Sequence, residues 1–324
     1  MLKNNYKIIF FGSAEFSVPI LETLIQNKMV DAVFSTPPRP VGRKQIVTPT
    51  PVSQAATQNQ VTVFEPENLS DEKFLNQVEK MRPDLFLVTA YGKILPKALL
   101  EIPPCGSINI HGSLLPKYRG SSPLQAALLN GDRETGITFI LMDEKVDHGP
   151  ILVKEKMKIK KNCTYSELAQ KMSFLAARIT PSVIEDFLNK KIKPLFQNDE
   201  EASYVKTIKK EDGHIDFNSP AKKILQQINA FEKWPGSYAF WKKDGKDLLV
   251  KILGGKILSG KIQSSTGNTT TNITGTAIKY KNLIAIQTSD GLLLVKKLQL
   301  EGQKSMDATS FLNGHPDFIG SQLF

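Results

Sequence analysis

Residues 8–26 read IIFFGSAEFSVPILETLIQ, and this stretch indicates the fold class of the first part of the chain. The apolar run Ile8–Gly12 ends in glycine and predicts a buried strand. Apolar residues then recur at helical spacing through residues 15–26, so strand, turn and helix follow one another. The alternation continues with expected strands at 30–35, 85–89 and 107–110 and helices at 72–81 and 96–100. This order predicts an α/β fold with a Rossmann-like parallel sheet, whose ligand site lies beyond the carboxyl ends of the strands.

The rest of the chain completes this domain and adds a smaller one. A strand over 136–141, an antiparallel edge strand over 151–159 and a helix opened by the capping-box pattern Thr164-x-x-Glu167 finish the first domain, which we place at residues 1–205. Residues 206–324 contain one expected helix, 221–230, and short strands separated by turn residues. The expected strands are 237–241, 248–253, 275–279, 283–287 and 292–300. They predict a small OB-like β-barrel.

The second domain carries most of the positive charge. The chain has 42 Lys plus Arg against 32 Asp plus Glu, a net charge of +10. Residues 206–324 hold 17 Lys and no Arg against 10 Asp plus Glu, which is seven of those ten charges. A basic barrel suits phosphate backbones, because each neutralised phosphate releases counterions. A lysine-rich surface that serves only solubility is the alternative.

Missing motifs weigh against several function classes. The sequence has no dinucleotide-binding Gly-x-Gly-x-x-Gly and no P-loop, which disfavours oxidoreductases and NTPases. Cys105 and Cys163 lack neighbours at ligand spacing, and the four histidines are widely spaced, so we expect no disulfide and no metal site. The N-terminal apolar run is too short for a signal peptide or a membrane span. We expect a cytoplasmic protein that contacts no membrane and is a monomer.

The segment SINIHGSLLPKYRG, residues 107–120, carries the densest group of chemically capable side chains. Asn109 and His111 alternate with apolar residues at a strand end, so period two puts both on one face. An amide donor beside an imidazole can bind the oxygen of a carbonyl under attack. A satisfied structural pair is the alternative. The loop MDEKVDHGP, residues 142–150, adds carboxylates, Asp147 among them, that could orient and charge the histidine.

These two segments resemble the signature of the folate-dependent formyltransferases. The matching pieces are Asn109-x-His111, Ser113-Leu114-Leu115-Pro116, Arg119-Gly120 and Asp147-x-Gly149. Further pieces along the whole chain are similar to the methionyl-tRNA formyltransferase family: Ile9–Gly12, Pro49–Val52, Ala90–Pro96, Tyr204–Lys206, Lys210–Asp216, Trp234–Gly236 and Phe311–His315. Several of them lie in the small domain, which simpler formyltransferases lack.

The resemblance implies a reaction and two substrates. The formyl group of 10-formyltetrahydrofolate would pass to the α-amine of methionine on initiator tRNA, without a metal or a covalent enzyme intermediate. Asn109 and protonated His111 would hold the tetrahedral oxyanion, and Asp147 would keep the imidazole charged. The first domain would bind the folate and the second would help to hold tRNA. The implied folate-binding residues are Tyr91, Gly92, Ile94, Leu95, Ser113, Leu114, Leu115, Pro116 and Leu141.

A basic, proline-rich segment, PPRPVGRKQIVT at residues 37–48, separates an early strand from the next helix. Loops of this length are usually functional or disordered. By resemblance it is the loop that covers the active site and touches the acceptor end of tRNA, and Arg43 matches the family's important arginine. The implied tRNA-binding residues are Arg39, Arg43, Lys44, Lys206 and Lys209. A solvated linker is the alternative.

Other functions remain open at this point. His148 stands where the family usually has threonine, and we expect it to serve a surface or packing role. A formyltransferase acting on an amino-sugar nucleotide is the nearest alternative enzyme, although it should lack the basic loop. A deformylase would use water as the acceptor. A non-catalytic RNA-binding protein with a degenerate enzyme domain would also explain the basic barrel, but intact Asn109, His111 and Asp147 disfavour it.

Overall fold

The structure is a computed structural model that describes residues 6–42, 44–258 and 273–324. Within these ranges the chain forms two compact units. The first contains residues up to 123 together with 134–158 and 168–206, and the second contains 124–133, 159–167 and the residues from 207 onward. The second unit thus includes two short segments from the first 205 residues.

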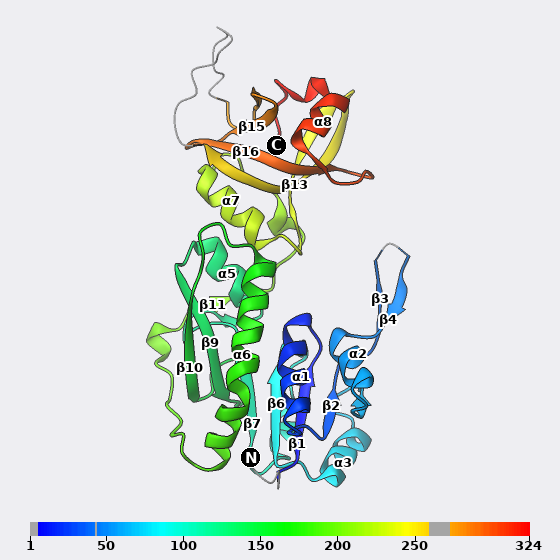
Figure 1. Ribbon diagram of the computed structural model, residues 1–324, viewed down its shortest axis with the longest axis vertical. Coiled ribbons are helices and arrows are strands. Elements are labelled where there is room, and N and C mark those ends of the chain that lie inside the picture. The colour runs from blue at the N-terminus through cyan, green and yellow to red at the C-terminus, as the bar shows by residue number, and fades with distance from the viewer. Residues whose placement is uncertain (1–5, 43, 259–272) are drawn as a thin grey trace. The chain divides into compact units, whose positions relative to one another are not determined.

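A seven-stranded sheet forms the centre of the first unit, in the order β10-β9-β7-β6-β1-β2-β5 (Figure 1). Its strands are β1 Ile8–Gly12, β2 Ala32–Phe34, β5 Val63–Phe64, β6 Leu85–Thr89, β7 Ser107–His111, β9 Glu134–Leu141 and β10 Ile151–Lys158. The five strands from β5 to β7 are parallel, whereas β9 is antiparallel to β7 and β10 is antiparallel to β9. The expected mostly parallel α/β sheet is confirmed. All five residues of β1 and of β6 are buried, as a sheet covered on both faces requires.

Helices and 3-10 turns lie between and after these strands. They are η1 Glu15–Ser17, α1 Val18–Gln26, α2 Pro51–Gln58, α3 Glu72–Met81, α4 Lys97–Leu100, α5 Pro123–Asn130, α6 Tyr165–Leu188 and η2 Asp199–Glu201. The expected capping box opens α6, because Thr164 N–H donates to Glu167 Oε2 at 3.2 Å and Glu167 N–H donates to Thr164 Oγ1 at 3.4 Å. Ser173 of α6 donates to the Phe16 carbonyl, which places α6 beside η1. No helix among the described residues is long and apolar enough to cross a membrane.

The segment 37–48, expected as an irregular loop, forms a hairpin. Strands β3 Arg39–Val41 and β4 Ile46–Thr48 pair antiparallel as a separate two-stranded sheet. Val41, Ile46 and Val47 are 58%, 61% and 64% exposed, so the hairpin buries little apolar surface of its own. Periodicity missed it because the strands are only three residues long and one contains proline. Arg43 lies outside the described residues.

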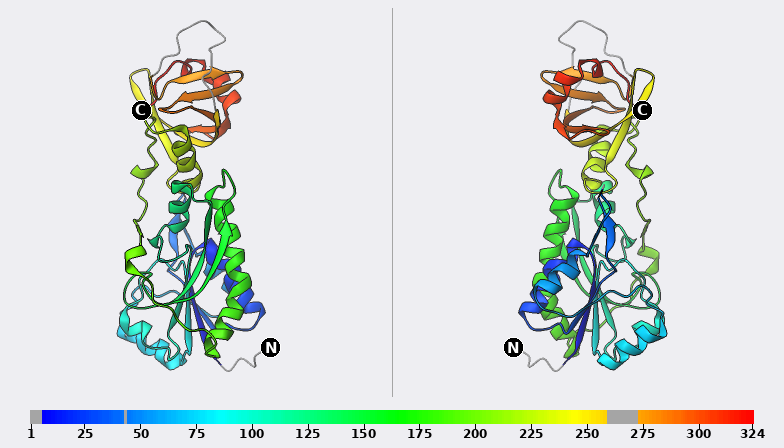
Figure 2. Two further views of the ribbon diagram at one scale, coloured as in Figure 1. Left: turned by 90° about the vertical axis from the view of Figure 1, so that its left-hand side faces the viewer. Right: turned by 90° about the vertical axis from the view of Figure 1, so that its right-hand side faces the viewer.

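The second unit is a curled antiparallel sheet in the order β12-β13-β16-β15-β14, with β17 paired to β16 (Figure 2). Its elements are η3 Glu211–Gly213, α7 Ala221–Ala230, β12 Ser237–Lys243, β13 Lys246–Leu258, β14 Ala277–Tyr280, β15 Leu283–Gln287, β16 Leu292–Leu300, β17 Met306–Asp307, α8 Ala308–Gly314 and η4 Pro316–Phe318. Asp244 and Gly245 both have positive φ (51° and 76°), as a two-residue hairpin turn between β12 and β13 requires.

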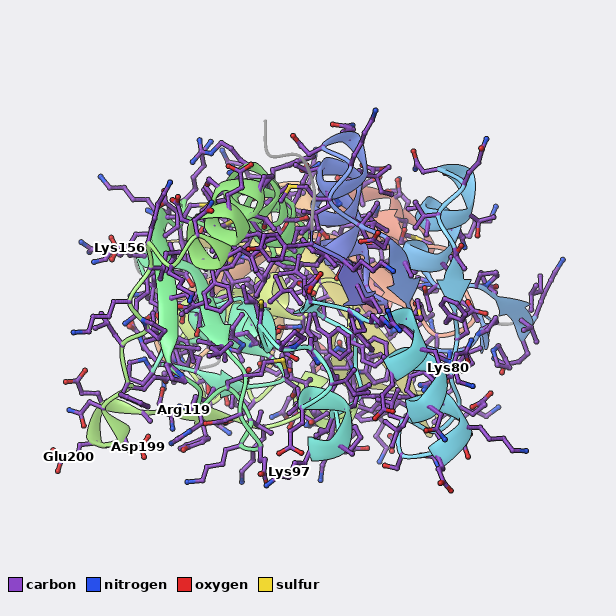
Figure 3. The ribbon with its side chains drawn as sticks, turned by 90° about the horizontal axis from the view of Figure 1, so that it is seen from below. Lys80, Lys97, Arg119, Lys156, Asp199 and Glu200 are labelled. Atoms are coloured by element: carbon purple, nitrogen blue, oxygen red, sulfur yellow. The ribbon has the colours of Figure 1, made fainter. Side chains whose placement is uncertain are left out.

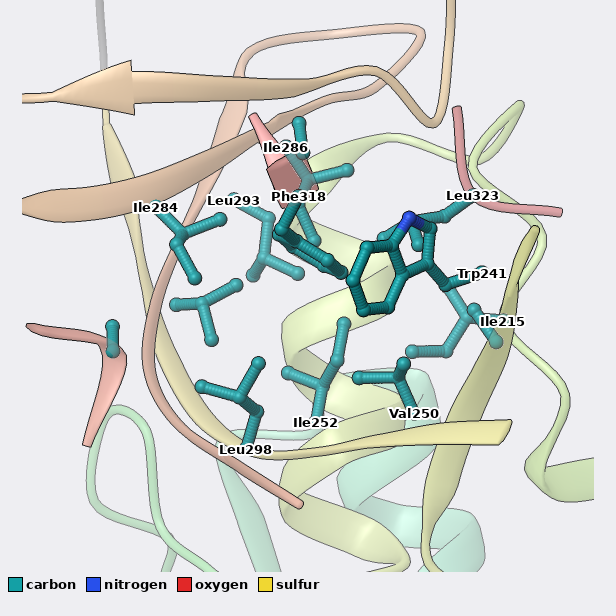
Figure 4. Close-up of a cluster of buried hydrophobic side chains, with 14 of the residues drawn as sticks. Ile215, Trp241, Val250, Ile252, Ile284, Ile286, Leu293, Leu298, Phe318 and Leu323 are labelled. Atoms are coloured by element: carbon teal, nitrogen blue, oxygen red, sulfur yellow. The ribbon is translucent and has the colours of Figure 1, made fainter. Parts of the chain in front are cut away.

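The last residues of the chain bridge the two ends of this curled sheet. Leu323 pairs with Trp241 of β12, and Gln322 pairs with Thr276 just before β14. Trp241 and Leu323 are 1% and 2% exposed and belong to the core of the unit, which also contains Phe318 (Figure 4). The sheet therefore curls around an apolar core.

Candidate active site

Strand β7 carries Asn109 and His111 at its carboxyl end. It lies between β6 and β9, so the strand is largely buried and its backbone is fixed on both sides. Side chains alternate along a strand, which puts residues 109 and 111 on the same face. His111 is 6% exposed, and Asn109 is partly buried. The strand therefore holds an amide and an imidazole side by side.

Asp147 joins this pair from the loop that follows β9. Its Oδ1 accepts a hydrogen bond from Asn109 Nδ2 at 3.1 Å and lies 3.4 Å from His111 Nδ1. Its Oδ2 accepts from the backbone N–H of Gly120 at 2.8 Å. The carboxylate is 10% exposed, so these contacts replace most of its hydration. The three side chains proposed from the sequence thus meet, and the N–H of Gly120 is a partner that the sequence did not indicate.

The second ring nitrogen of His111 is also engaged. Its Nε2 lies 2.9 Å from the carbonyl oxygen of Tyr118. A carbonyl oxygen only accepts, and the carboxylate of Asp147 at Nδ1 also only accepts when ionised. Both ring nitrogens of His111 therefore face acceptor groups.

The backbone of Asp147 contacts Gln197, which in turn contacts a buried arginine, Arg119. Arg119 is 1% exposed and donates to Gln197 Oε1 from Nε at 3.1 Å and from Nη2 at 2.9 Å. It also donates to Tyr204 Oη at 3.0 Å and to Asp199 Oδ1 at 2.8 Å. Arg119 and Asp199 are labelled in Figure 3. The hydrogen bond from Arg119 lowers the pKa of the Asp199 carboxyl group. Gln197, 50 residues from Asp147, has no local sequence signal, whereas the Arg119-Gly120 motif could have indicated this cluster.

His148, the departure from the family pattern, does not pair with its neighbour Asp147. Its Nδ1 lies 2.6 Å from Asp143 Oδ2, and its Nε2 lies 3.6 Å from Asp199 Oδ2. The side chain is 30% exposed. His148 therefore links the loop after β9 to the segment around Asp199, outside the trio of Asn109, His111 and Asp147.

The expected folate-binding residues fall into two segments, 91–95 and 113–116, and the single residue Leu141. Residues 91–95 follow β6, the neighbour of β7 in the sheet. Tyr91 and Leu95 are buried, whereas Ile94 is 76% exposed. A side chain at Gly92, whose φ is +85°, would meet no other atom within 4 Å, so that face of the backbone is open. Leu141 ends β9 and is partly buried.

Tyr91 is unusual among these residues. Its hydroxyl oxygen is buried without a hydrogen-bond partner among the described residues. Burial raises the pKa of Tyr91 to about 12. Its ring packs edge-on against Phe11 at a centroid distance of 5.4 Å. The side chain therefore belongs to the core, and only the backbone of this residue is available to a ligand.

Residues 113–116 form a tight turn after β7. Ser113 is fully buried, and its hydroxyl donates to the carbonyl of Lys117 at 2.5 Å. The N–H of Leu115 donates to Thr138 Oγ1 at 3.1 Å, and that hydroxyl donates to the Ser113 carbonyl at 2.6 Å. A carbonyl cannot remove the proton of a serine hydroxyl, so these contacts give Ser113 a structural role rather than that of an activated nucleophile. Leu114 and Pro116 complete the turn.

The expected tRNA-binding residues do not form one cluster within a unit. Arg39 and Lys44 are exposed on the β3–β4 hairpin of the first unit. Lys206 ends the last segment of the first unit, and Lys209 belongs to the second unit, where its N–H donates to Asp212 Oδ2 at 2.7 Å. All four side chains reach solvent, as phosphate-binding cations must.

Two family models match the chain. Residues 6–184 match the family described as formyl transferase, and residues 207–316 match the formyl transferase C-terminal domain. The chain is 39% identical to methionyl-tRNA formyltransferase from Trichlorobacter lovleyi, an alignment that covers 98% of this chain and 97% of the other. It is 37% identical to methionyl-tRNA formyltransferase from Methylacidiphilum infernorum, covering 98% of each.

Solved structures share the fold. A sugar 3N-formyl transferase, WlaRD, crystallised in the presence of dTDP and 5-N-formyl-THF, matches with a TM-score of 0.63 and 19% identity over 92% of this chain and 99% of the other. At this identity the likeness bears on the fold alone. The chain thus shares its fold with that protein, and 37–39% of its aligned residues are identical in the two relatives.

Proposed function

The chain belongs to the methionyl-tRNA formyltransferase family, and from this premise we propose that it transfers the formyl group of 10-formyltetrahydrofolate to the α-amino group of methionine on initiator tRNA. The observation that carries the proposal is the convergence of Asn109, His111 and Asp147 within the formyl transferase region. The product is N-formylmethionyl-tRNA, the charged tRNA of translation initiation. The site of action follows from the substrate and is the cytoplasm.

The reaction is an acyl transfer through a tetrahedral intermediate. The neutral α-amine attacks the formyl carbon, a C–N bond forms, and the formyl oxygen takes up negative charge. Collapse of the intermediate breaks the bond to N10 of the folate. One proton leaves the attacking amine and one reaches N10, which gives formyl-amide and tetrahydrofolate. Because charge develops on one oxygen, donors aimed at that oxygen accelerate the step.

Asn109 and His111 supply these donors. One hydrogen of Asn109 Nδ2 is taken by Asp147, which leaves the second for the oxyanion. The Nε2–H of His111 bonds to the Tyr118 carbonyl, so the formyl oxygen competes with that carbonyl for the same donor. Oxygen that becomes an anion is the stronger acceptor. The imidazole contact therefore strengthens as the intermediate forms, which is the property that raises rate rather than substrate affinity.

Asp147 acts on both donors. Its Oδ1 holds the amide of Asn109 in place and faces the Nδ1 side of His111, where a carboxylate stabilises the charged ring. A carboxylate beside the reacting amine can also accept its proton through a water molecule. Ser113 forms no bond to the formyl group in this mechanism, which is a direct transfer between the two substrates.

Folate binding is proposed for the open backbone at Tyr91, Gly92 and Leu95, with Ile94 and Leu141 as apolar contacts. The turn of Ser113, Leu114, Leu115 and Pro116 would form the opposite wall. The exposed Ile94 and the free space beside Gly92 fit a flat heterocycle that needs both apolar surface and backbone hydrogen bonds. Folate is a substrate here, and no metal enters the proposed mechanism.

Binding of tRNA is proposed for Arg39 and Lys44 of the hairpin, for Lys206 and Lys209, and, by its position in the sequence, for Arg43. Exposed cations on a protruding hairpin suit the phosphates of an acceptor stem. The lysine-rich second unit supplies further positive charge along the polyanion. We also propose that one copy of the chain suffices for both substrates, which size-exclusion chromatography with light scattering can check.

The test is a formylation assay with 10-formyltetrahydrofolate, methionyl-initiator tRNA and an amino-sugar nucleotide as competing acceptor. We expect wild type to formylate the charged tRNA alone. His111→Ala should lose about 10²- to 10³-fold in kcat, whereas Arg43→Ala should mainly raise KM for tRNA. Formylation of the sugar nucleotide alone would refute the substrate, and formylation of neither would refute the activity.

A further inference from the structure

Gln197 lies in a segment with little regular structure between α6 and β11 Tyr204–Val205. The segment brings its side chain to the loop of residues 142–150, which carries Asp147 and is called the catalytic loop below. Leu195 and Ile151 exchange two backbone hydrogen bonds of 2.7 and 2.9 Å. Further on, the carbonyl of Ser203 accepts from the N–H of Arg119 at 2.8 Å. The segment is therefore anchored before and after Gln197, which fixes where this side chain lies.

The amide of Gln197 has partners on both of its ends. Its Nε2 donates to the carbonyl oxygens of Asp147 and Gly149, each at 2.9 Å. Its Oε1 accepts the two hydrogen bonds from Arg119. Arginine only donates and carbonyl oxygens only accept, so a flipped amide would face like groups on both sides. Arg119 thus determines which way the amide of Gln197 points.

Asp147 is held twice from one short strand, β8 Arg119–Gly120. The N–H of Gly120 binds its carboxylate, and Arg119, through Gln197, binds its backbone carbonyl. The second contact stabilises the backbone conformation of Asp147. This residue has a φ of 51°, in the left-handed region that is unfavourable for residues with a side chain. The surrounding contacts must maintain such a conformation.

We propose that Gln197 is a positioning residue for formyl transfer and that Arg119 fixes the amide through which it acts. Gln197 holds the backbone of Asp147 so that the carboxylate stays within reach of Asn109 and His111 at once. The inference rests on the proposed function, since it assigns a role within that reaction. Gln197 acts through Asp147 and touches neither substrate, so its loss should lower kcat and leave both KM values within about twofold.

Two variants separate the contacts of Gln197. Gln197→Leu removes the hydrogen bonds on both sides. Gln197→Glu keeps an acceptor for Arg119 but turns an oxygen toward the carbonyls of Asp147 and Gly149, which repels them. A displacement of about 1 Å at a reacting group can cost about 10²-fold. We expect kcat to fall about 10- to 100-fold in both variants. The larger loss within this range is expected for Gln197→Glu.

Glu200→Gln is the matched control. Glu200 is exposed in the same segment (Figure 3), and only its backbone N–H takes part in a hydrogen bond there, to Asn198 Oδ1. The control should keep wild-type kcat and KM. An equal loss in this variant would show that the segment as a whole, not the amide of Gln197, is responsible.

Combination with Asp147→Asn tests whether Gln197 acts through Asp147. In that background we expect Gln197→Leu to cost less than about twofold, because the residue it positions is already disabled. The same fold-loss in both backgrounds would overturn the proposal. A crystal structure of Gln197→Leu in which Asp147 keeps its contacts with Asn109 and Gly120 would also overturn the proposal. If Gln197→Leu does not fold, the crystal structure of Gln197→Glu provides the same test.

The same measurements separate this inference from the proposed function. If wild type does not formylate methionyl-tRNA, the proposed function fails, while the position of Asp147 in the variant crystal still decides whether Gln197 holds it. If wild type is active and Asp147 does not move in the variant, only the role of Gln197 fails.

Discussion

The side-chain amide of Asn109 and the carboxylate of Asp147, 38 residues apart in the sequence, are joined by a hydrogen bond of 3.1 Å. The same carboxylate oxygen faces His111 at 3.4 Å. One oxygen atom thus sets the orientation of both proposed oxyanion donors. Damage to Asp147 should therefore disturb the amide and the imidazole together rather than one of them.

Asp147→Asn should lower kcat about 10³-fold, with little change in KM for either substrate. The substitution keeps the size of the side chain but removes its charge, and one of its two acceptor oxygens becomes a donor. Single-turnover formylation measures the effect. Glu144→Gln, in the same loop and 62% exposed at the side chain, is the control and should leave kcat unchanged. A comparable loss in the control would point to the charge of the loop instead.

Gly149→Ala should lower kcat at least about 10-fold through a shift of the catalytic loop. A Cβ at Gly149 would overlap the backbone carbonyl of Leu141 at the end of β9, and backbone cannot move aside cheaply. Gly254→Ala is the control, since a Cβ there would meet no atom within 4 Å. Steady-state kinetics on both variants decide the matter. Normal activity of Gly149→Ala would mean that the loop tolerates displacement.

Tyr91→Phe should make the protein more resistant to alkali. The pKa of Tyr91 is about 12 in the folded chain, against a model-peptide value of about 10, so below pH ~10 both states are neutral and no stability is lost. As pH rises from about 10 towards about 12 the unfolded chain ionises first, and the folded state loses up to about 3 kcal/mol. Phenylalanine does not ionise and leaves no buried hydroxyl without a partner.

Urea unfolding of wild type and Tyr91→Phe at pH about 8 and about 11.5 measures this difference. Other groups titrate in the same pH range in both proteins. The relevant quantity is therefore how the difference in unfolding free energy between variant and wild type changes with pH. We expect the gap to widen at high pH in favour of the variant. A gap that does not change with pH would mean that Tyr91 is not desolvated in solution.

Leu323→Ala should lower the free energy of unfolding of the second unit by about 2–4 kcal/mol. Leu323 is 2% exposed in the core, and its backbone lies on the closure between the two ends of the curled sheet. Ile257→Ala is the control, because that side chain is 38% exposed. Thermal unfolding followed by calorimetry should show the change. Equal melting temperatures for Leu323→Ala and wild type would show that the closure adds no stability.

Local pattern was sufficient for much of the architecture. The expected bounds of α3, α7, β6, β15 and β16 match those of the structure, because each has an uninterrupted periodicity between clear turn or capping signals. The capping box predicted where helix α6 begins but not where it ends. The helix runs on to Leu188, because buried Val183 and Ile184 continue its apolar face beyond Pro181. The short strands of the 39–48 hairpin gave no periodic signal.

The candidate site divides in the same way. Asn109 and His111 could be paired from the sequence, because residues two apart in a strand lie on the same face of the sheet. Asp147 was proposed from its motif, but its contact with both residues depends on the antiparallel packing of β9 against β7. Gln197 could not be found at all. Its role depends on a hydrogen bond across 50 residues and on a buried arginine that orients its amide.

The sequence by itself predicted the types of the longer, periodic elements, the α/β class of the first part, the excess positive charge of the second and the residues proposed to stabilise an oxyanion. Only the tertiary structure decided which carbonyl faces His111, what holds Asp147 in a left-handed conformation and how residues 322–323 bridge the ends of the curled sheet. The reason is physical: periodicity reports the burial of one face of one element. Hydrogen bonds between distant segments depend on where the folded chain places each donor and acceptor.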